Sequence, residues 1–327
     1  MMRKLEPEEL SRLVFGAWAV FSDERGTRFS RMPEEQIALA KQISEVYETR
    51  ARNDAGIFLD FMTGSPELEI GITMLHDYEG CPIVLEVLVN GESLGILRRD
   101  SLLDGSGRLS MHLPSGRNRV TVFLSGMCRI ALTEFSVTEG AEVTPLPKKR
   151  KLLFLGDSIT QGYHAEHPSK AFPSQIAWRT DSDLLNLGIG GARFDPGSLD
   201  EALVYPVDRI FVSYGTNDWR HSECSEAFRT YPGAFFQKLK KMYPDTPIDV
   251  ILPIWRKESE IPGFGNGDFL EARRYYARLA EGIGARVIDT WDFVPHEEDF
   301  FYDRKLHPND KGMGLLAEGL LKAIGTL

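Results

Sequence analysis

The chain has 327 residues, which exceeds the usual size of one compact domain and leaves room for two. Its 42% hydrophobic and 26% charged residues are typical of a folded globular protein and exclude a chain that is disordered throughout. The formal net charge of -10 argues against broad electrostatic attachment to nucleic acid or to an anionic membrane surface.

The N-terminus and the cysteines indicate the compartment. Residues 1–9 are charged where a secretory signal would carry its apolar region, and no later apolar run is long enough to span a membrane. Cys81, Cys128 and Cys224 are widely spaced and odd in number, so they suggest neither a disulfide framework nor a metal knuckle. We therefore expect a cytoplasmic protein without membrane attachment.

The first half of the chain is expected to be rich in β-structure. A helix over residues 34–50 is predicted first, with Pro33 at a tolerated first-turn position. Alternating apolar residues and turn signals such as Asn90-Gly91 then predict short strands at Ile57 to Met62, Leu68 to Met74, Ile83 to Val89, Leu94 to Leu97, Leu109 to Leu113, Val120 to Leu124 and Ile130 to Val137. This pattern indicates an antiparallel, jelly-roll-like β-sandwich. We assign residues 1–147 to this accessory domain.

The pattern changes after a polar, proline-containing stretch at residues 138–149. Strands are predicted at Leu152 to Leu155, Leu184 to Leu187, Ile210 to Ser213, Ile248 to Pro253 and Ala285 to Ile288, and helices at Ala171 to Arg179, Glu223 to Met242, Phe269 to Gly282 and Lys311 to Ile324. This alternation predicts an α/β domain at residues 148–327, with a flavodoxin-like parallel sheet flanked by helices. Ligands bind such sheets at the carboxyl ends of the strands.

Three predicted strands end in polar, glycine-bearing turns. These turns are Gly156-Asp157-Ser158, Asn186-Leu187-Gly188 and Gly215-Thr216-Asn217-Asp218, and His307 lies just before the last helix. Acyl transfer needs a nucleophile, a base and donors for the developing oxyanion. Ser158 would attack, His307 would accept its proton, and the donors would be the N–H groups of Ser158 and Gly188 and the amide of Asn217. Asp157 and Asp218 are expected to shape their turns.

In order and spacing, these motifs resemble the SGNH, or GDSL-like, hydrolase superfamily. The resemblance implies an esterase that needs no metal or other cofactor. The family usually carries an aspartate three residues before the histidine, but this chain has Arg304 there and Asp303 one position earlier. Two arrangements stay open: Asp303 completes a triad, or a backbone carbonyl orients His307 in a dyad.

Several residues near the predicted site are candidates for contact with a substrate. Trp219, Trp255, Arg256 and Tyr302 follow the strand ends or the histidine loop, where aromatic rings could stack on a sugar, although large aromatics more often belong to a core. His164 and His167 beside Glu166 are expected to form a surface loop rather than a metal site.

A β-sandwich joined to an SGNH domain resembles two-domain bacterial carbohydrate esterases. This resemblance implies that the partner is a small acylated carbohydrate or ester, from which a short acyl group, most simply acetyl, is removed. One alternative is a lipase, lysophospholipase or thioesterase of the same superfamily. Another is a carbohydrate-binding protein without catalysis.

Overall fold

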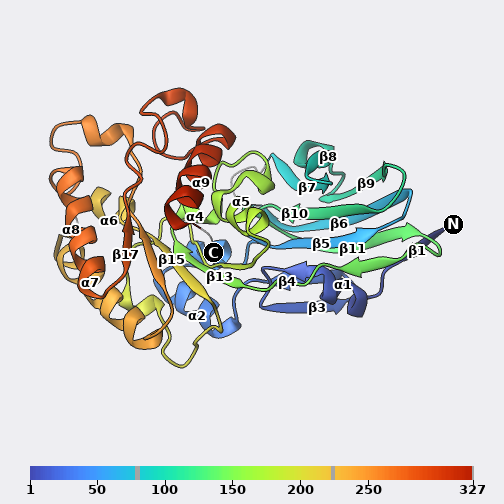
Figure 1. Ribbon diagram of the computed structural model, residues 1–327, viewed down its shortest axis with the longest axis horizontal. Coiled ribbons are helices and arrows are strands. Elements are labelled where there is room, and N and C mark those ends of the chain that lie inside the picture. The colour runs from blue at the N-terminus through green and yellow to red at the C-terminus, as the bar shows by residue number, and fades with distance from the viewer. Residues whose placement is uncertain (78–81, 222–224, 326–327) are drawn as a thin grey trace.

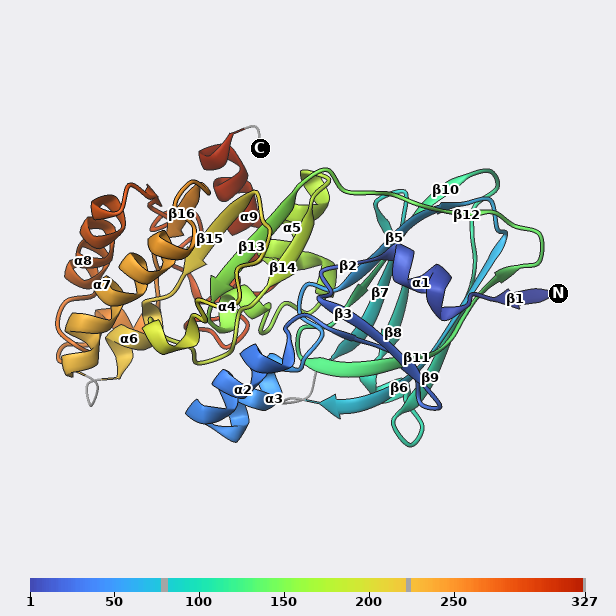
Figure 2. The same ribbon diagram turned by 90° about the horizontal axis from the view of Figure 1, so that it is seen from below.

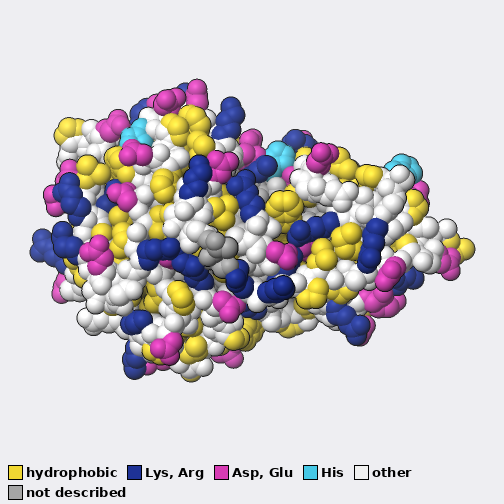
Figure 3. All heavy atoms as spheres, viewed as in Figure 1, with side chains coloured by type: hydrophobic (Ala, Val, Ile, Leu, Met, Phe, Trp, Pro, Cys, Tyr) yellow, Lys and Arg dark blue, Asp and Glu magenta, His cyan; other side chains and the backbone are white. Residues whose placement is uncertain are grey.

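A computed structural model describes residues 1–77, 82–221 and 225–325 of the chain. The N-terminal half forms a β-rich part and the C-terminal half forms an α/β part, and the two lie side by side (Figures 1 and 2). Acidic and basic side chains are interspersed over the face shown in Figure 3. Cys128 is buried, whereas Cys81 and Cys224 lie outside the described residues.

The β-rich part is a sandwich of two antiparallel sheets, as predicted. One sheet has the order β3-β4-β11-β6-β9, with β1 also paired to β11, and the other has the order β12-β5-β10-β7-β8, with β2 also paired to β5. The strands are β1 (Met2–Lys4), β2 (Val14–Phe15), β3 (Ala19–Asp23), β4 (Gly26–Ser30), β5 (Phe58–Thr63), β6 (Glu67–Asp77), β7 (Ile83–Val89), β8 (Glu92–Arg98), β9 (Ser106–His112), β10 (Asn118–Leu124), β11 (Cys128–Thr138) and β12 (Val143–Pro145).

The sandwich also packs against the α/β part through its second sheet. Phe58 of β5 and Phe123 of β10 point out of the sandwich core and join a cluster with Leu152 and Phe154 of the other half. All of β7 is buried because one of its faces meets the sandwich core and the other meets this cluster.

The C-terminal half contains a five-stranded parallel sheet in the order β14-β13-β15-β16-β17, which confirms the predicted flavodoxin-like arrangement. Side chains of α5 and α9 cover one face, and those of α2, α7 and α8 cover the other. The strands are β13 (Lys151–Gly156), β14 (Asp183–Asn186), β15 (Arg209–Ser213), β16 (Ile248–Ile251) and β17 (Arg286–Ile288), and the helices are α4 (Ser158–Gln161), α5 (Phe172–Arg179), α6 (Thr216–Arg220), α7 (Ser225–Met242), α8 (Phe269–Gly282) and α9 (Asp310–Ile324).

The N-terminal segment differs from the prediction. The single helix expected at 34–50 is two helices, α2 (Glu34–Ile43) and α3 (Glu45–Ala51). Ser44 separates them, because its backbone is extended and its hydroxyl caps α3 by accepting the N–H of Tyr47. The sequence pattern also gave no sign of α1 (Pro7–Leu13) or of β1 to β4. In the parts of the chain that are described, no helix has the length and apolarity needed to cross a membrane.

A buried arginine joins the two halves. The Arg31 side chain donates hydrogen bonds to the carbonyl oxygens of Asn53 (2.9 Å) and Arg50 (2.8 Å), and to that of Asn186 at the end of β14. Arg31 is 1% exposed, and its burial lowers its pKa to about 9. The three carbonyls thus stabilise a charge that water does not reach.

Replacing Arg31 by methionine is expected to destabilise the protein by about 3 kcal/mol or more, because the change leaves three acceptors without their donor. Arg25→Met is the matched control, since the Arg25 side chain is 59% exposed; it is expected to change stability by less than about 0.5 kcal/mol. Urea unfolding measures both. Equal midpoints for the two variants would contradict a joining role for Arg31.

Candidate active site

Ser158 lies directly after the first strand of the parallel sheet. β13 ends at Gly156, and Asp157 caps the short helix α4 by accepting the N–H of Ile159 at 3.0 Å. Ser158 is the first residue of α4, so its N–H has no acceptor within the helix. The residue is 7% exposed.

The structure brings Ser158, His307 and Asp303 together in a chain of hydrogen-bonding atoms. The Ser158 Oγ lies 2.9 Å from the His307 Nε2, and the His307 Nδ1 lies 2.7 Å from the Asp303 Oδ2. The group that contacts the imidazole is therefore Asp303 and not a backbone carbonyl. Of the two predicted alternatives, the triad and the dyad, this contact is that of the triad. This order of groups is that of a nucleophile, a base and an orienting carboxylate.

The Asp303 carboxylate reaches His307 although it lies four residues before it. The other carboxylate oxygen, Oδ1, accepts the backbone N–H groups of Lys305, Leu306 and His307 at 2.9–3.1 Å. Arg304, at the position where the family usually has aspartate, adopts a left-handed backbone with φ of 60°. This conformation accommodates the extra residue in the loop.

The electrostatics keep Asp303 ionised. Partial burial works to raise its pKa, but the hydrogen bond from His307, the charge of His307 and the backbone N–H groups outweigh burial and hold the pKa below its ordinary value. An ionised carboxylate beside Nδ1 favours the tautomer that carries its proton on Nδ1. That tautomer leaves Nε2 free to accept the Ser158 proton.

Gly188 lies in close contact with α4. A Cβ at position 188 would lie 2.6 Å from the backbone nitrogen of Gln161, so no larger residue fits there. The Gly188 N–H donates to the Asn186 side-chain oxygen at 3.0 Å. Of the expected oxyanion donors, this one therefore already has an acceptor within the protein.

Asn217 follows β15 in a turn that begins at Gly215, whose φ is 117°. One N–H of its side-chain amide donates to the Ala192 carbonyl at 3.1 Å, which ties the turn to the loop carrying Gly188. A primary amide has two N–H donors, and this hydrogen bond uses one of them. The buried Arg256 supports this turn by donating to the carbonyl and hydroxyl oxygens of Thr216 at 3.1 and 3.0 Å.

Side chains that the sequence did not single out hold the Gly188 loop. Tyr47 of α3 donates its hydroxyl hydrogen to the Gly191 carbonyl at 2.6 Å, and Arg50 donates to the Gly190 carbonyl. On the other side, the Gln161 side-chain oxygen accepts the Gly190 N–H at 2.8 Å. Tyr47 and Arg50 belong to no motif and are more than 130 residues from the loop, so no local signal could have identified them.

Three predicted substrate contacts are buried instead. Trp219 is 1% exposed, packs against Phe264 and Phe269, and donates to the Gly267 carbonyl. Trp255 stacks on His296, and Arg256 supports the Asn217 turn. The expectation that these side chains face the rim is wrong for this structure, because position after a strand does not fix the direction of a side chain.

Tyr302 is the predicted contact that stays accessible. It is 48% exposed, and its ring stacks on that of His164 with centroids 4.2 Å apart. His164 has a left-handed backbone (φ 64°), and its ring centroid lies 5.3 Å from that of His307. Burial, followed by the neighbouring His307, lowers the pKa of His164 to about 4. A neutral aromatic pair therefore lies beside the base.

His167, the other histidine of this loop, pairs with Asp310 at 2.6 Å.

Comparisons with known proteins identify relatives of the fold and of the C-terminal half. Residues 154–315 match the model of the GDSL-like Lipase/Acylhydrolase family. A salicylyl-acyltransferase from a tetracycline biosynthetic pathway superposes with a TM-score of 0.82 at 22% identity, over 100% of this chain and 98% of that chain. No curated protein sequence matches.

Two esterases with solved structures share the whole architecture. A family two carbohydrate esterase from Cellvibrio japonicus has a TM-score of 0.66 at 15% identity, over 99% of this chain and 97% of that chain. An acetyl xylan esterase from Butyrivibrio proteoclasticus has a TM-score of 0.64 at 15% identity, over 99% and 98%. These likenesses show the fold. The chain, through its C-terminal half, belongs to the GDSL-like lipase/acylhydrolase family.

Asp157 makes stability depend on pH. Burial raises its pKa from 3.8 to about 7, so the folded state holds this proton more tightly than the unfolded chain. Its contribution to stability is present below about pH 4 and is lost as the pH rises to about 7. Asp157→Asn keeps an oxygen for the cap but cannot ionise. The wild type therefore loses stability as the pH rises and the variant does not. The free energy of unfolding of the variant minus that of the wild type is expected to increase by at most about 4 kcal/mol between pH 4 and 8.

Urea unfolding at several pH values measures this difference. Asp292→Asn, at an exposed position, is the matched control and is expected to track the wild type at every pH. If the free energies of unfolding of Asp157→Asn and wild type differ by the same amount at every pH, burial does not raise the pKa of Asp157.

Proposed function

We propose that the protein is a serine esterase with Ser158 as nucleophile, His307 as base and Asp303 as the group that orients the base. The continuous contact from Ser158 Oγ to His307 Nε2 (2.9 Å) and from His307 Nδ1 to Asp303 Oδ2 (2.7 Å) carries this proposal. Membership of the acylhydrolase family supports it.

The mechanism follows from these contacts. Ser158 Oγ attacks the ester carbonyl while His307 Nε2 takes its proton, and a tetrahedral oxyanion forms. The oxyanion accepts hydrogen bonds from the Ser158 N–H and from the second N–H of the Asn217 amide; Gly188 contributes where its N–H is shared with Asn186. The intermediate collapses to an acyl-serine as His307 returns the proton to the leaving alcohol. Water, deprotonated by His307, then releases the acid.

The proposed substrate is a carbohydrate or glycoside that bears a short acyl group, most simply acetyl. Two structural neighbours named as a carbohydrate esterase and an acetyl xylan esterase support this choice. The exposed ring of Tyr302, stacked on His164 beside His307, offers a surface on which a sugar ring can lie.

Ser158→Ala is expected to lower the turnover of 4-nitrophenyl acetate at least about 1,000-fold, because it removes the nucleophile. Asp303→Asn is expected to lower kcat about 100- to 10,000-fold, because the amide no longer holds the imidazole in its productive tautomer. Asp292→Asn, the same change at an exposed position, serves as the control and should leave turnover unchanged. If Ser158→Ala still turns over the ester, the proposed mechanism is contradicted. If Asp303→Asn keeps full activity, a Ser158–His307 dyad is favoured over a triad.

Acetate esters are expected to be hydrolysed at least about tenfold more efficiently than octanoate esters, measured as kcat/KM. The physical reason is that the mainly apolar cavity of about 290 Å³ is lined by neither Ser158 nor His307, so it does not extend from the nucleophile as a channel for a long acyl chain. A preference for octanoate would favour a lipase or thioesterase. Sugar binding without turnover of either ester would favour a carbohydrate-binding protein.

The same assay distinguishes hydrolysis from acyl transfer. An acyl-serine can pass its acyl group to an alcohol as well as to water, and one structural neighbour is named as an acyltransferase. When a sugar alcohol is added to the assay, we expect an esterase to release mainly the free acid. A new ester as the main product would favour an acyltransferase.

A further inference from the structure

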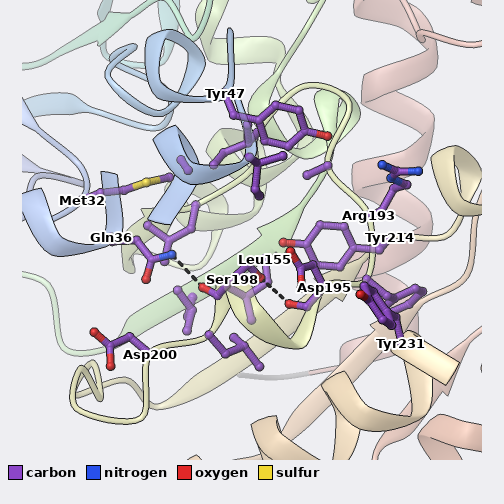
Figure 4. A pocket seen from close by; sticks show the side chains of 18 of the residues that line it. Met32, Gln36, Tyr47, Leu155, Arg193, Asp195, Ser198, Asp200, Tyr214 and Tyr231 are labelled. Carbon is purple, nitrogen blue, oxygen red and sulfur yellow. Dashed lines mark hydrogen bonds between the residues drawn. The ribbon is translucent and has the colours of Figure 1, made fainter. Parts of the chain in front are cut away.

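A mainly apolar cavity lies under the loop that follows β14. Its volume is about 290 Å³. Helices α2 and α3 border it on one side, and β13, the 189–203 segment and α7 border it on the others. Figure 4 shows Met32, Gln36 and Tyr47 reaching it from the segment that carries α2 and α3, with Gln36 bonded to the Ser198 carbonyl across the space (2.8 Å).

The walls of this cavity are mainly apolar and aromatic. Rings of Phe194, Tyr214 and Phe228 and the side chains of Leu155 and Leu187 contribute to them. Protein interiors contain few voids larger than a water molecule, and a dry apolar cavity of about 150 Å³ is known to accept benzene. A volume of about 290 Å³ therefore has room for a molecule of roughly two rings. Flat rings also suit walls that present aromatic edges and faces.

Two buried oxygen atoms of residues that line the cavity have no hydrogen-bond partner within the described residues. They are the Asp218 Oδ2 and the Tyr205 hydroxyl, and both residues are 4% exposed. Buried polar atoms nearly always have a partner, since leaving one unpaired costs free energy. A hydroxyl group on a bound molecule is the kind of partner that these two lining residues lack.

We propose that this cavity is a second small-molecule site, which binds a neutral aromatic molecule of about two rings that carries a hydroxyl group. It is separate from the proposed catalytic site, because Ser158, Asp303 and His307 do not line it. The molecule enters past Ile43 and Tyr231, which line the cavity and are each 44% exposed. An anionic molecule is disfavoured because its charge would lose hydration against the apolar walls, and because three aspartates (Asp195, Asp200 and Asp218) line the cavity against one cation, Arg193.

Isothermal titration of the full chain with 1-naphthol tests the proposal. Saturable binding at one molecule per chain is expected, and 2-naphthalenesulfonate is expected to bind at least tenfold more weakly. Ala40→Phe places a ring into the cavity and should weaken 1-naphthol binding at least tenfold, since Ala40 lines the cavity and is 4% exposed. Ala38→Phe is the matched control on the exposed face of the same helix and should bind like wild type.

A second pair of variants, Ile43→Asp and its control Val46→Asp, keeps the test valid if Ala40→Phe does not fold. Ile43→Asp puts a carboxylate at the rim and should also weaken binding at least tenfold, whereas Val46→Asp, at a residue that is 49% exposed and outside the lining, should not. Binding should persist in Ser158→Ala, so an inactive enzyme would not count against the site. Absence of saturable binding to wild type, or equal affinity within both pairs, would overturn the proposal.

Discussion

The buried guanidinium of Arg31 is the interaction on which the rest of the structure depends. A guanidinium donates hydrogen bonds and accepts none, so it is tolerated in a protein interior only where acceptors surround it. Its acceptors come from the end of α3, from the turn after it and from the last residue of β14. The strand end that leads into Gly188 is therefore fixed to the N-terminal half. Because Tyr47 and Arg50 hold the next carbonyls of the same loop, both halves of the chain build this edge of the sheet.

The N-terminal half also covers part of one face of the parallel sheet. In a parallel sheet the connection between strands that follow one another in sequence usually includes a helix that packs on the sheet. The connection from β14 to β15 contains only the short 3-10 turn Pro196–Ser198. Ile37 and Ala40 of α2 take the place of that helix by packing with Leu153 and Leu185. The cavity under the loop lies between these separate segments.

Sequence reasoning succeeded where the signal was local. The five apolar strands of the parallel sheet and the residues at their ends follow from periodicity and motif spacing. The first strands could not be predicted, because β1 and β2 have only two or three residues and are fixed by β11 and β5, far along the chain. The burial of Trp219 was likewise out of reach, because the rings of Phe264 and Phe269, 45 and 50 residues later, determine where its side chain packs.

The histidine loop shows why spacing is a weaker guide than hydrogen bonding. The absence of aspartate three residues before His307 counts against a triad if only positions are compared. An imidazole, however, is oriented by the direction of the group that accepts its N–H, and one additional residue changes that direction only if the backbone cannot turn back. Arg304 makes the turn with its left-handed backbone, and the Asp303 carboxylate fixes it by accepting three consecutive N–H groups. The residue that departs from the family pattern is thus the one whose backbone keeps the carboxylate beside the imidazole.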